Sequence, residues 1–235
     1  MDFKKYQKSF EYSYTLGAFP TIEMIKAKPE CVKEVYVHST FKDTQMLEKL
    51  CNDNNIRIIQ SDKAINRLSD KDNVFVIGIF EKFSLELDNT KPQVVLVNPS
   101  DMGNLGTILR TCAGFGIYDI AVISPGADIF NPKVVRSSMG AIFRLRHKYY
   151  DSFDEYRNEN PNHEVFTFML NGRKQLTVSD CPKPELFALV FGNEASGLDN
   201  SYLDRGTSII IPQSPDVDSL NLTIAVGVGV FMFTH

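Results

Sequence analysis

Hydrophobic residues in the first 80 positions alternate between two spacings. Some stretches repeat apolar residues every three to four positions, as on one face of a helix, whereas others are short runs rich in β-branched and aromatic residues. This alternation predicts a small α/β domain. The predicted helices span residues 19–27, 44–53 and 61–69, and the predicted strands span residues 33–38, 56–60 and 73–80.

A second domain is predicted after a polar stretch, residues 81–92, which ends in Pro92 and is the best linker candidate in the chain. The run that follows, QVVLVN at 93–98, is almost entirely apolar, as expected of a parallel sheet covered on both faces. We therefore expect domains at residues 1–85 and 92–235. Further apolar strands are predicted at residues 118–124, 164–170, 186–192 and 207–212.

Composition limits the classes of function. The chain has 235 residues, of which 43% are hydrophobic, enough for a well-packed core. Its 29 acidic and 25 basic residues give a net charge of −4, which argues against a uniformly basic nucleic-acid binder and leaves only a local patch. The candidate patch comprises Lys133, Arg136, Arg144, Arg146, His147 and Lys148, with residues 171–174 as a second candidate. For any one of these residues, a solvated charged face is an equally good interpretation.

Membrane and metal roles are not expected. The first residues contain no continuous apolar segment, and the longest apolar run, Leu220–Phe233, is shorter than the roughly 20 residues that span a bilayer. The four cysteines are widely separated, as in reduced cytoplasmic proteins. Neither they nor the four histidines have a metal-ligand spacing, so we predict a cytoplasmic protein without a bound metal.

Polar or glycine-containing loops follow three predicted strands, at the edge where open α/β sheets bind ligands. In the first loop, Asn104 lies between Gly103 and Gly106 and precedes a helix that carries Arg110 away from its apolar face. Asn104 as a simple helix cap, with Arg110 in solvent, is an equally good interpretation of this loop taken alone. The glycine spacing excludes a dinucleotide fingerprint, and no Lys–Ser/Thr pair completes a P-loop.

The second and third loops carry further candidates. Glu194 lies between Gly192 and Gly197, where glycine lets a ligand approach the backbone closely. Taken alone, Glu194 is as readily interpreted as a charged residue in a solvent-facing turn. Ser219 is a possible cap for a helix beginning at Leu220. Asn221 then falls inside an apolar helix start, where a buried amide needs a partner.

Taken together, the three loops resemble the motifs of the SpoU (TrmH-like) branch of the SPOUT methyltransferases. These enzymes transfer methyl from S-adenosylmethionine to a ribose 2′-hydroxyl of rRNA or tRNA. The motifs are N-x-G-x-x-x-R in GNLGTILRT, G-x-E-x-x-G in GNEASG, and S-L-N at residues 219–221. They occur in the family's order, and the resemblance covers residues 92–235, including NPKVVRSSMGAIFRL between the first two motifs.

The resemblance implies a fold and a set of site residues. It implies a carboxy-terminal SPOUT domain with a deep trefoil knot on a mostly parallel sheet, a homodimer, and Arg110 nearest the acceptor hydroxyl. Since a guanidinium has no lone pair to accept a proton, we expect Arg110 to bind phosphate and stabilise a developing alkoxide. The catalytic set is Arg110, Asn104, Glu194, Ser219 and Asn221. The cofactor set is Leu170, Asn171, Gly172, Gly192, Ile211, Gln213, Ser219 and Leu220.

Two further features bear on the substrate. Residues 1–85 resemble, more loosely, the L30e-like RNA-binding domain of family members that act on ribosomal RNA, which favours rRNA (23S) over tRNA as the partner. The third motif carries Gln213 and Pro215 where the family commonly has Met and Gly. These two departures motivate the alternative of a catalytically silent RNA-binding or ribosome-associated protein with the same fold.

Overall fold

The computed structural model describes residues 3–235 and divides them into two compact units. Unit 1 comprises the chain up to Phe83 together with Asp128–Arg144, and unit 2 comprises Ser84–Ala127 and Leu145–His235. These units differ from the predicted domains, 1–85 and 92–235, chiefly in one segment, because Asp128–Arg144 packs within unit 1. No helix among residues 3–235 is both long and apolar enough to span a membrane.

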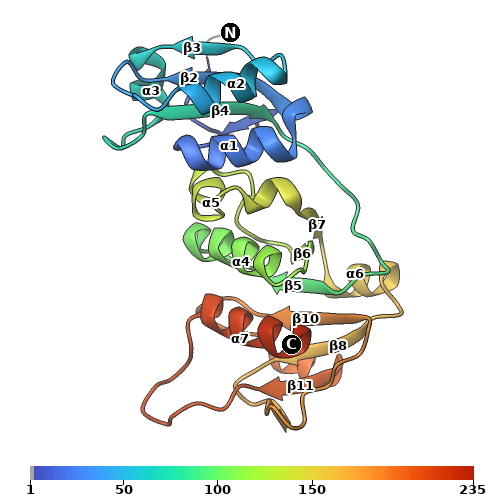
Figure 1. Cartoon of the computed structure of the whole chain (residues 1–235). Coiled ribbons are helices and arrows are strands. Elements are labelled where there is room, and N and C mark those ends of the chain that lie inside the picture. The colour runs from blue at the N-terminus through green and yellow to red at the C-terminus, as the bar shows by residue number, and fades with distance from the viewer. Residues whose placement is uncertain (1–2) are drawn as a thin grey trace. The chain divides into compact units, whose positions relative to one another are not determined.

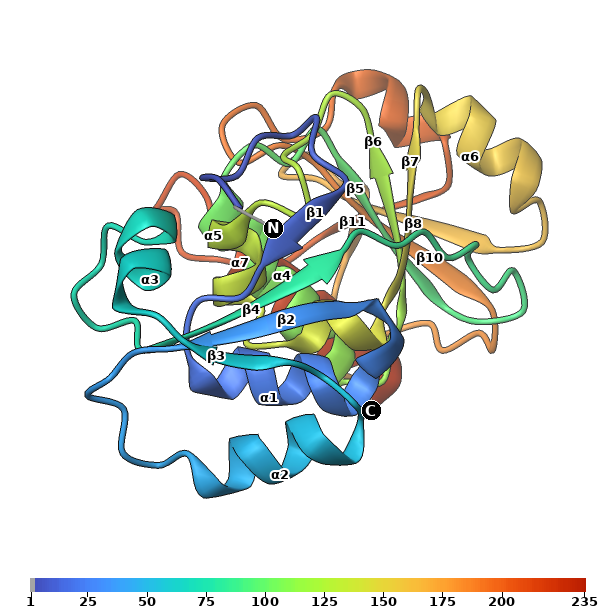
Figure 2. The ribbon, with the colours of Figure 1, turned by 90° about the horizontal axis from the view of Figure 1, so that it is seen from above.

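Unit 1 is built on a four-stranded sheet with the order β1-β4-β2-β3. β2 and β3 are parallel, and the other pairs are antiparallel. Helices α1 and α2 lie side by side along this sheet (Figure 2). The strands are β1 (Tyr12–Tyr14), β2 (Val32–Val37), β3 (Ile58–Gln60) and β4 (Val76–Glu81). The helices are α1 (Ala18–Ala27), α2 (Gln45–Asp53), α3 (Asp62–Leu68) and a 3₁₀ turn at Pro29–Cys31.

The segment Asp128–Arg144 completes the core of unit 1. It contributes helix α5 (Pro132–Ser137) and a 3₁₀ helix at Ala141–Arg144. The ring of Phe143 packs edge-on against Phe80 of β4, with centroids 5.0 Å apart. The Ser13 hydroxyl donates to the carbonyl of Phe130, and Arg144 pairs with Glu23 at 2.7 Å. Apolar burial and specific polar contacts therefore both join this segment to β1, α1 and β4.

Unit 2 is an α/β layer built on a seven-stranded sheet, β7-β6-β5-β10-β8-β11-β9, in which every neighbouring pair is parallel. The strands β5 and β10 lie next to each other in this sheet (Figure 1). Its central strands are mostly apolar and buried, as the sequence predicts, although β5 and β6 begin with Gln93 and Asp119. The strands are β5 (Gln93–Val97), β6 (Asp119–Ile123), β7 (Arg146–Tyr150), β8 (Glu164–Phe168), β9 (Lys174–Gln175), β10 (Phe187–Phe191) and β11 (Thr207–Ile210).

Two helices of unit 2 pack against each other and bring distant loops together. They are α4 (Met102–Gly114) and α7 (Leu222–Thr234), whereas α6 (Phe153–Glu159) follows β7 and a 3₁₀ helix spans Asn200–Asp204. Gly229 of α7 faces β8 and β10, where a Cβ would lie only 2.9 Å from the rings of Phe168 and Phe191. This glycine lets α7 approach the sheet closely.

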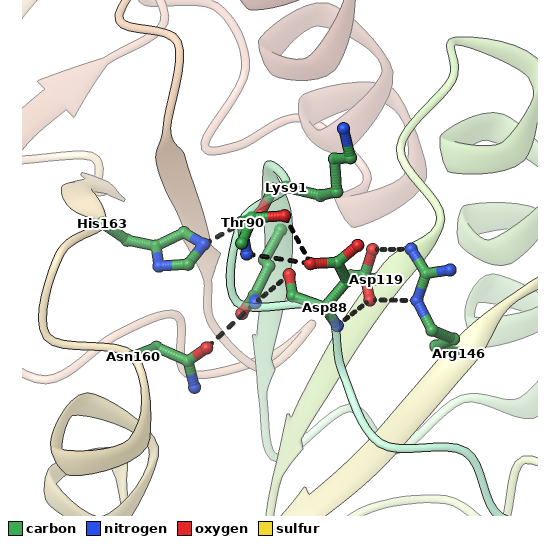
Figure 3. A network of polar contacts seen from close by, with 8 residues as sticks. Asp88, Thr90, Lys91, Asp119, Arg146, Asn160 and His163 are labelled. Carbon is green, nitrogen blue, oxygen red and sulfur yellow. Dashed lines mark hydrogen bonds and ion pairs between the residues drawn. The ribbon is translucent and has the colours of Figure 1, made fainter.

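The predicted linker is a structured part of unit 2 (Figure 3). The amide of Asp88 donates to Asp119, and the carboxylate of Asp119 also accepts two hydrogen bonds from Arg146, at 2.6 and 2.5 Å. The carbonyl of Lys91 is 2.8 Å from Nε2 of His163. The boundary between the two units, Phe83 and Ser84, falls within the predicted linker 81–92, and residues 85–91 find partners in unit 2 at Asp119 of β6 and at His163, just before β8. We call residues 85–91 the strap.

Buried polar side chains continue this network beneath the strap. Gln93 donates to Asn160 at 3.0 Å and accepts from the hydroxyl of Tyr156 at 2.8 Å. All three side chains are buried, so each hydrogen bond satisfies groups that water cannot reach. This amino-terminal edge of the sheet is thus held by paired polar groups.

Candidate active site

A cavity of about 330 Å³ opens at the carboxyl edge of the parallel sheet in unit 2. Loops that follow β8, β10 and β11 form its wall together with the start of α7. The lining residues are Phe168, Met169, Leu170, Asn171, Phe191, Gly192, Asn193, Glu194, Ala195, Ser196, Gly197, Leu198, Ile211, Gln213, Ser219, Leu220, Leu222 and Ala225. Ligands of open α/β sheets bind at this edge, so the cavity is the candidate site.

Seven of the eight residues predicted to bind a cofactor line this cavity. The exception is Gly172, which packs against β11 instead. A Cβ at Gly172 would lie 2.4 Å from the carbonyl carbon of Ile209, so this position accepts only glycine for structural reasons. A Cβ at Gly192 would likewise lie 2.1 Å from the carbonyl carbon of Gly197, and this close approach folds the loop 192–198 tightly.

Glu194 joins the cavity wall to the segment that precedes α4. Its carboxylate accepts from the amide and hydroxyl of Ser100, at 3.0 and 2.9 Å, and from the amide of Asp101 at 3.0 Å. Burial raises the pKa of Glu194, but these hydrogen bonds together outweigh burial and leave the pKa below its ordinary value. Glu194 is therefore an anionic acceptor that holds a loop.

Asp101 caps α4, and Asn104 does not. Oδ1 of Asp101 accepts from the amide of Asn104 at 2.7 Å, so the helix begins one turn earlier than the cap interpretation of Asn104 requires. The side chain of Asn104 is half-buried on the first turn of α4. Arg110 lies further along α4, is exposed, and pairs with no other residue among those described. Neither Asn104 nor Arg110 lines the cavity of its own chain.

Asn221 caps α7. Its side-chain oxygen accepts from the amide and the hydroxyl of Thr223, at 2.8 and 2.6 Å. The expectation of a buried amide inside a helix beginning at Leu220 was therefore wrong, since Asn221 is exposed and α7 begins at Leu222. Ser219 does not cap the helix and lies instead on the cavity wall.

Gln213 organises the loop that departs from the family pattern. Its amide nitrogen donates to the carbonyl of Asp218 at 3.2 Å, across the turn that contains Pro215. This contact closes the loop between β11 and α7 on itself. The unusual glutamine thus shapes the cavity rim from within the chain.

The predicted basic patch is mostly neutralised. Arg144 pairs with Glu23, Arg146 with Asp119, and Lys148 with Glu86 and Glu159. His147 is buried, whereas Lys133 is exposed and Arg136 is half-buried. In the second candidate, residues 171–174, Arg173 pairs with Asp204. Among these patch candidates, Arg144, Arg146 and Lys148 are thus engaged by acidic side chains, and these three cations serve contacts within the chain.

Sequence reasoning missed Asn193, the residue before Glu194. Its side chain hydrogen-bonds within its own loop and also to the loop before α4, where the carbonyl of Asn98 accepts from it at 2.8 Å. The signal available in the sequence was its place inside the G-x-E-x-x-G motif. Among residues 3–235, no three His, Cys, Asp or Glu side chains gather closely enough to hold a metal ion.

Comparison with known proteins places residues 91–231 in a family described as the SpoU rRNA methylase family. Over 141 residues the chain is 34% identical to an uncharacterized tRNA/rRNA methyltransferase of Synechocystis, covering 59% of this chain and 51% of that protein. Over 149 residues it is 33% identical to the 23S rRNA (guanosine(2553)-2′-O)-methyltransferase RlmP of Bacillus subtilis, covering 60% and 58%. The chain thus spans little more than half the length of these curated relatives.

Solved structures share the fold over nearly the whole chain. The SpoU methyltransferase AviRb of Streptomyces viridochromogenes, solved in complex with the cofactor AdoMet, superposes with a TM-score of 0.82 at 20% identity, covering 95% of this chain and 89% of that one. At this identity the likeness establishes the α/β architecture with its mostly parallel sheet. Because the family model matches more than half of the chain and includes all three motif loops, the chain belongs to the SpoU rRNA methylase family.

Proposed function

We propose that this protein is an S-adenosylmethionine-dependent RNA methyltransferase that modifies a ribose 2′-hydroxyl. One observation carries the proposal: two of the three family motif loops line a single cavity, and the third is tied to it through Glu194. Relatives named as 2′-O-methyltransferases of ribosomal RNA support the same activity.

The residues of the cavity fit this cofactor. The backbone amides of Leu170, Ile211 and Leu220 have no acceptor within the described chain, so they are free to bind a polar ligand. Phe191, Met169 and Leu198 supply apolar walls for a flat heterocycle. S-adenosylmethionine, when bound, supplies a methyl group on a sulfonium, which is already activated and requires no metal. The eight predicted cofactor residues remain our proposal for the binding set, with Gly172 acting through the loop's shape.

Arg110 is the residue we propose nearest the acceptor ribose. Its guanidinium is exposed and unpaired in the described chain, so its hydrogen-bond donors are available to an RNA phosphate and to a developing alkoxide. Glu194 holds the segment before α4, while Ser219 lies on the cavity wall. Asn104 and Asn221 complete the proposed catalytic set as supports at the starts of α4 and α7.

A homodimer and a trefoil knot are further parts of the proposal. Ile224 and Phe231 lie seven residues apart on one face of α7 and are 55% and 48% exposed, an apolar stripe that a second subunit would cover. Since Arg110 does not line its own chain's cavity, a partner subunit is a natural place for it to act. Residues of the loops 192–198 and 211–221 line the same cavity, which supports a knot in which α7 passes through one of these loops.

Unit 1 is the proposed RNA-binding domain, with an L30e-like fold. Unit 1 contains 16 Lys and Arg against 13 Asp and Glu, whereas unit 2 contains 9 against 16, so the net charges are +3 and −7. Phosphate binding favours the positive unit. We propose rRNA ahead of tRNA as the substrate, although relatives named for tRNA exist.

The described cysteines are all unpaired, which supports a cytoplasmic location.

Labelled-methyl transfer to separated rRNA and tRNA, followed by mapping of the 2′-O-methyl position, tests the function. We expect incorporation into RNA ribose. Incorporation only into protein or DNA would overturn the proposal. Calorimetry with S-adenosylmethionine distinguishes an active methyltransferase from the catalytically silent alternative. A silent RNA-binding protein would show no binding of the cofactor at high micromolar cofactor concentration.

A further inference from the structure

Asn193 connects two loops that belong to different parts of the site. Its Nδ2 group donates to the carbonyl of Asn98 at 2.8 Å and approaches the hydroxyl of Ser100 at 3.3 Å. Its Oδ1 accepts from the amides of Ala195 and Ser196, at 2.9 and 3.2 Å, within its own loop. One side chain thus shapes the cavity wall with its oxygen and fastens that wall to the segment before α4 with its nitrogen.

The segment that Asn193 contacts has a defined backbone. Asn98 has a φ of +51°, in the left-handed region that few residues other than glycine adopt without cost. Its amide donates to the carbonyl of Ile123 at 3.0 Å, and its carbonyl accepts from Asn193. Both backbone groups at this bend are therefore satisfied, and the chain is directed from β5 toward α4.

The contacts continue without a gap into α4. Glu194 accepts from the amides of Ser100 and Asp101, and Asp101 in turn caps the helix by accepting from the amide of Asn104. Asn104 and Arg110 are both carried on this helix. The position of α4 relative to the cavity thus depends on two adjacent residues, Asn193 and Glu194.

We propose that Asn193 is a positioning residue for methyl transfer, which fixes the start of α4 against the wall of the cofactor cavity. This inference rests on the proposed function. Asn193 does not exchange protons or contact the reacting atoms. Its contribution is to hold α4, with Asn104 and Arg110, in the geometry that the reaction needs.

The variant Asn193→Asp separates the two halves of this side chain. A carboxylate still accepts from Ala195 and Ser196, so the turn of the cavity loop is kept. The second carboxylate oxygen replaces the donor, and it faces the carbonyl of Asn98 and the carboxylate of Glu194, which lies 3.3 Å from Nδ2. The variant therefore removes the hydrogen bonds of Asn193 to the segment before α4 and leaves the loop's own hydrogen bonds. Asn162→Asp, an exposed position at the opposite edge of the sheet, is the matched control for charge.

Two measurements test the proposal. Hydrogen exchange in the protein without cofactor should be about tenfold faster in the first turn of α4 for Asn193→Asp than for the control, because one ordinary hydrogen bond corresponds to roughly that factor. In methyl transfer, kcat should fall about tenfold or more, while the Kd for S-adenosylmethionine stays within about threefold of wild type.

The pH profile provides a signature that loop collapse would not produce. As pH falls, the new carboxyl takes up a proton, which Glu194 beside it favours, and regains a donor for the carbonyl of Asn98. The deficit in kcat relative to wild type should then narrow. Unchanged kcat and unchanged exchange in α4 would overturn the proposal, as would equal losses of cofactor affinity and turnover. A wild-type protein that transfers no methyl to RNA would instead refute the proposed function.

Discussion

The two edges of the seven-stranded sheet carry similar polar residues but use them differently. At the amino edge, the carboxylate of Asp119, the amide of Gln93 and the guanidinium of Arg146 all find partners inside the chain. At the carboxyl edge, the amides of Ile211 and Leu220 have no acceptor among the described residues, and Arg110, on the α4 helix that starts there, is exposed without a partner among them. The polar groups named at the amino edge are paired within the fold, whereas those at the carboxyl edge remain available to a ligand.

This difference explains which charged residues to assign to function. A buried charge that is paired within the chain costs too much to expose and serves structure. An exposed arginine without a partner costs little to keep and is available for recognition. We therefore assign Arg146 to stability, whereas Arg110 stays the residue that we propose for chemistry, although both are arginines in the family-matching region.

The largest expected effect is that of Arg110→Ala on methyl transfer. Loss of a donor that stabilises developing charge lowers kcat by about 10²- to 10³-fold, whereas an exposed, unpaired side chain changes the free energy of unfolding by only about 0.5 kcal/mol. Single-turnover methylation and urea unfolding measure the two quantities. Arg205→Ala, which removes an exposed arginine that lies just before β11 and pairs with Asp154, is the control. Near-normal turnover in Arg110→Lys would count against a specific guanidinium role.

At the amino edge we expect a substitution to lower stability and to leave methyl transfer largely unchanged. Asp119→Ala removes the partner of Arg146 and an acceptor for the strap, and Asp119 is only 1% exposed. Because the Arg146 side chain is one-third exposed and water relieves part of its charge, we expect a loss of about 2–3 kcal/mol in unfolding free energy, at the lower end of buried pairs. Urea midpoints measure this loss. Methyl transfer well below the unfolding temperature should remain near wild type, and a selective loss of turnover would contradict the contrast between the two edges.

The sequence predicts those strands of the fold that are buried along their whole length. It does not predict strands or ion pairs that depend on contacts with residues distant in sequence. Strands β5 and β10 can be predicted from their apolar runs, because both faces of each strand are covered and most of their residues are therefore hydrophobic. Strand β7, RHKYY, carries charges along its length and becomes a strand only through pairing with β6. Arg144 and Glu23 are 121 residues apart, so no local pattern indicates that this cation is neutralised.

The site was predictable as motif loops, whereas the roles within each loop were not. Ser100, Asp101 and Asn104 are all good cap residues, and only the path of the chain out of β5 selects Asp101. The same holds for Ser219 and Asn221 before α7. A motif therefore specifies which side chains are present, and the backbone decides which of them is used as a cap.

A smaller effect is expected from cap substitutions at Asn221. Asn221→Ala removes the acceptor for Thr223 and should cost about 1 kcal/mol in unfolding free energy. Asn221→Ser preserves a good cap, so stability should be retained. If Asn221 also supports methyl transfer, Asn221→Ser will be stable but slower, as measured by kcat beside the urea midpoint. Equal activity of Asn221→Ser and wild type would restrict this residue to capping.

The smallest expected effect is a pH dependence of stability at the amino edge. Burial lowers the pKa of His163 from its ordinary value of 6.5, and its Nδ1 is buried without a hydrogen-bond partner among the described residues. A histidine with a lowered folded-state pKa is neutral in the fold, while the unfolded chain takes up a proton below pH 6.5. The unfolded state then binds more protons, so stability falls as pH drops below that value.

The loss of unfolding free energy from His163 is small, and a variant that cannot titrate isolates it. Between about pH 6.5 and 5.5 the loss from His163 is at most about 1 kcal/mol, since one full proton per pH unit corresponds to about 1.4 kcal/mol and the unfolded histidine is only partly protonated at the start of this interval. His163→Gln keeps a donor for the carbonyl of Lys91 and cannot titrate, so its urea midpoint should fall less over this interval. The hydrogen bonds that lower the pKa of Glu194 act in a separate window, below pH 4.5, where protonation weakens the carboxyl edge. If the urea midpoint of His163→Gln depended on pH as that of wild type does, a group other than His163 would be responsible for the pH dependence.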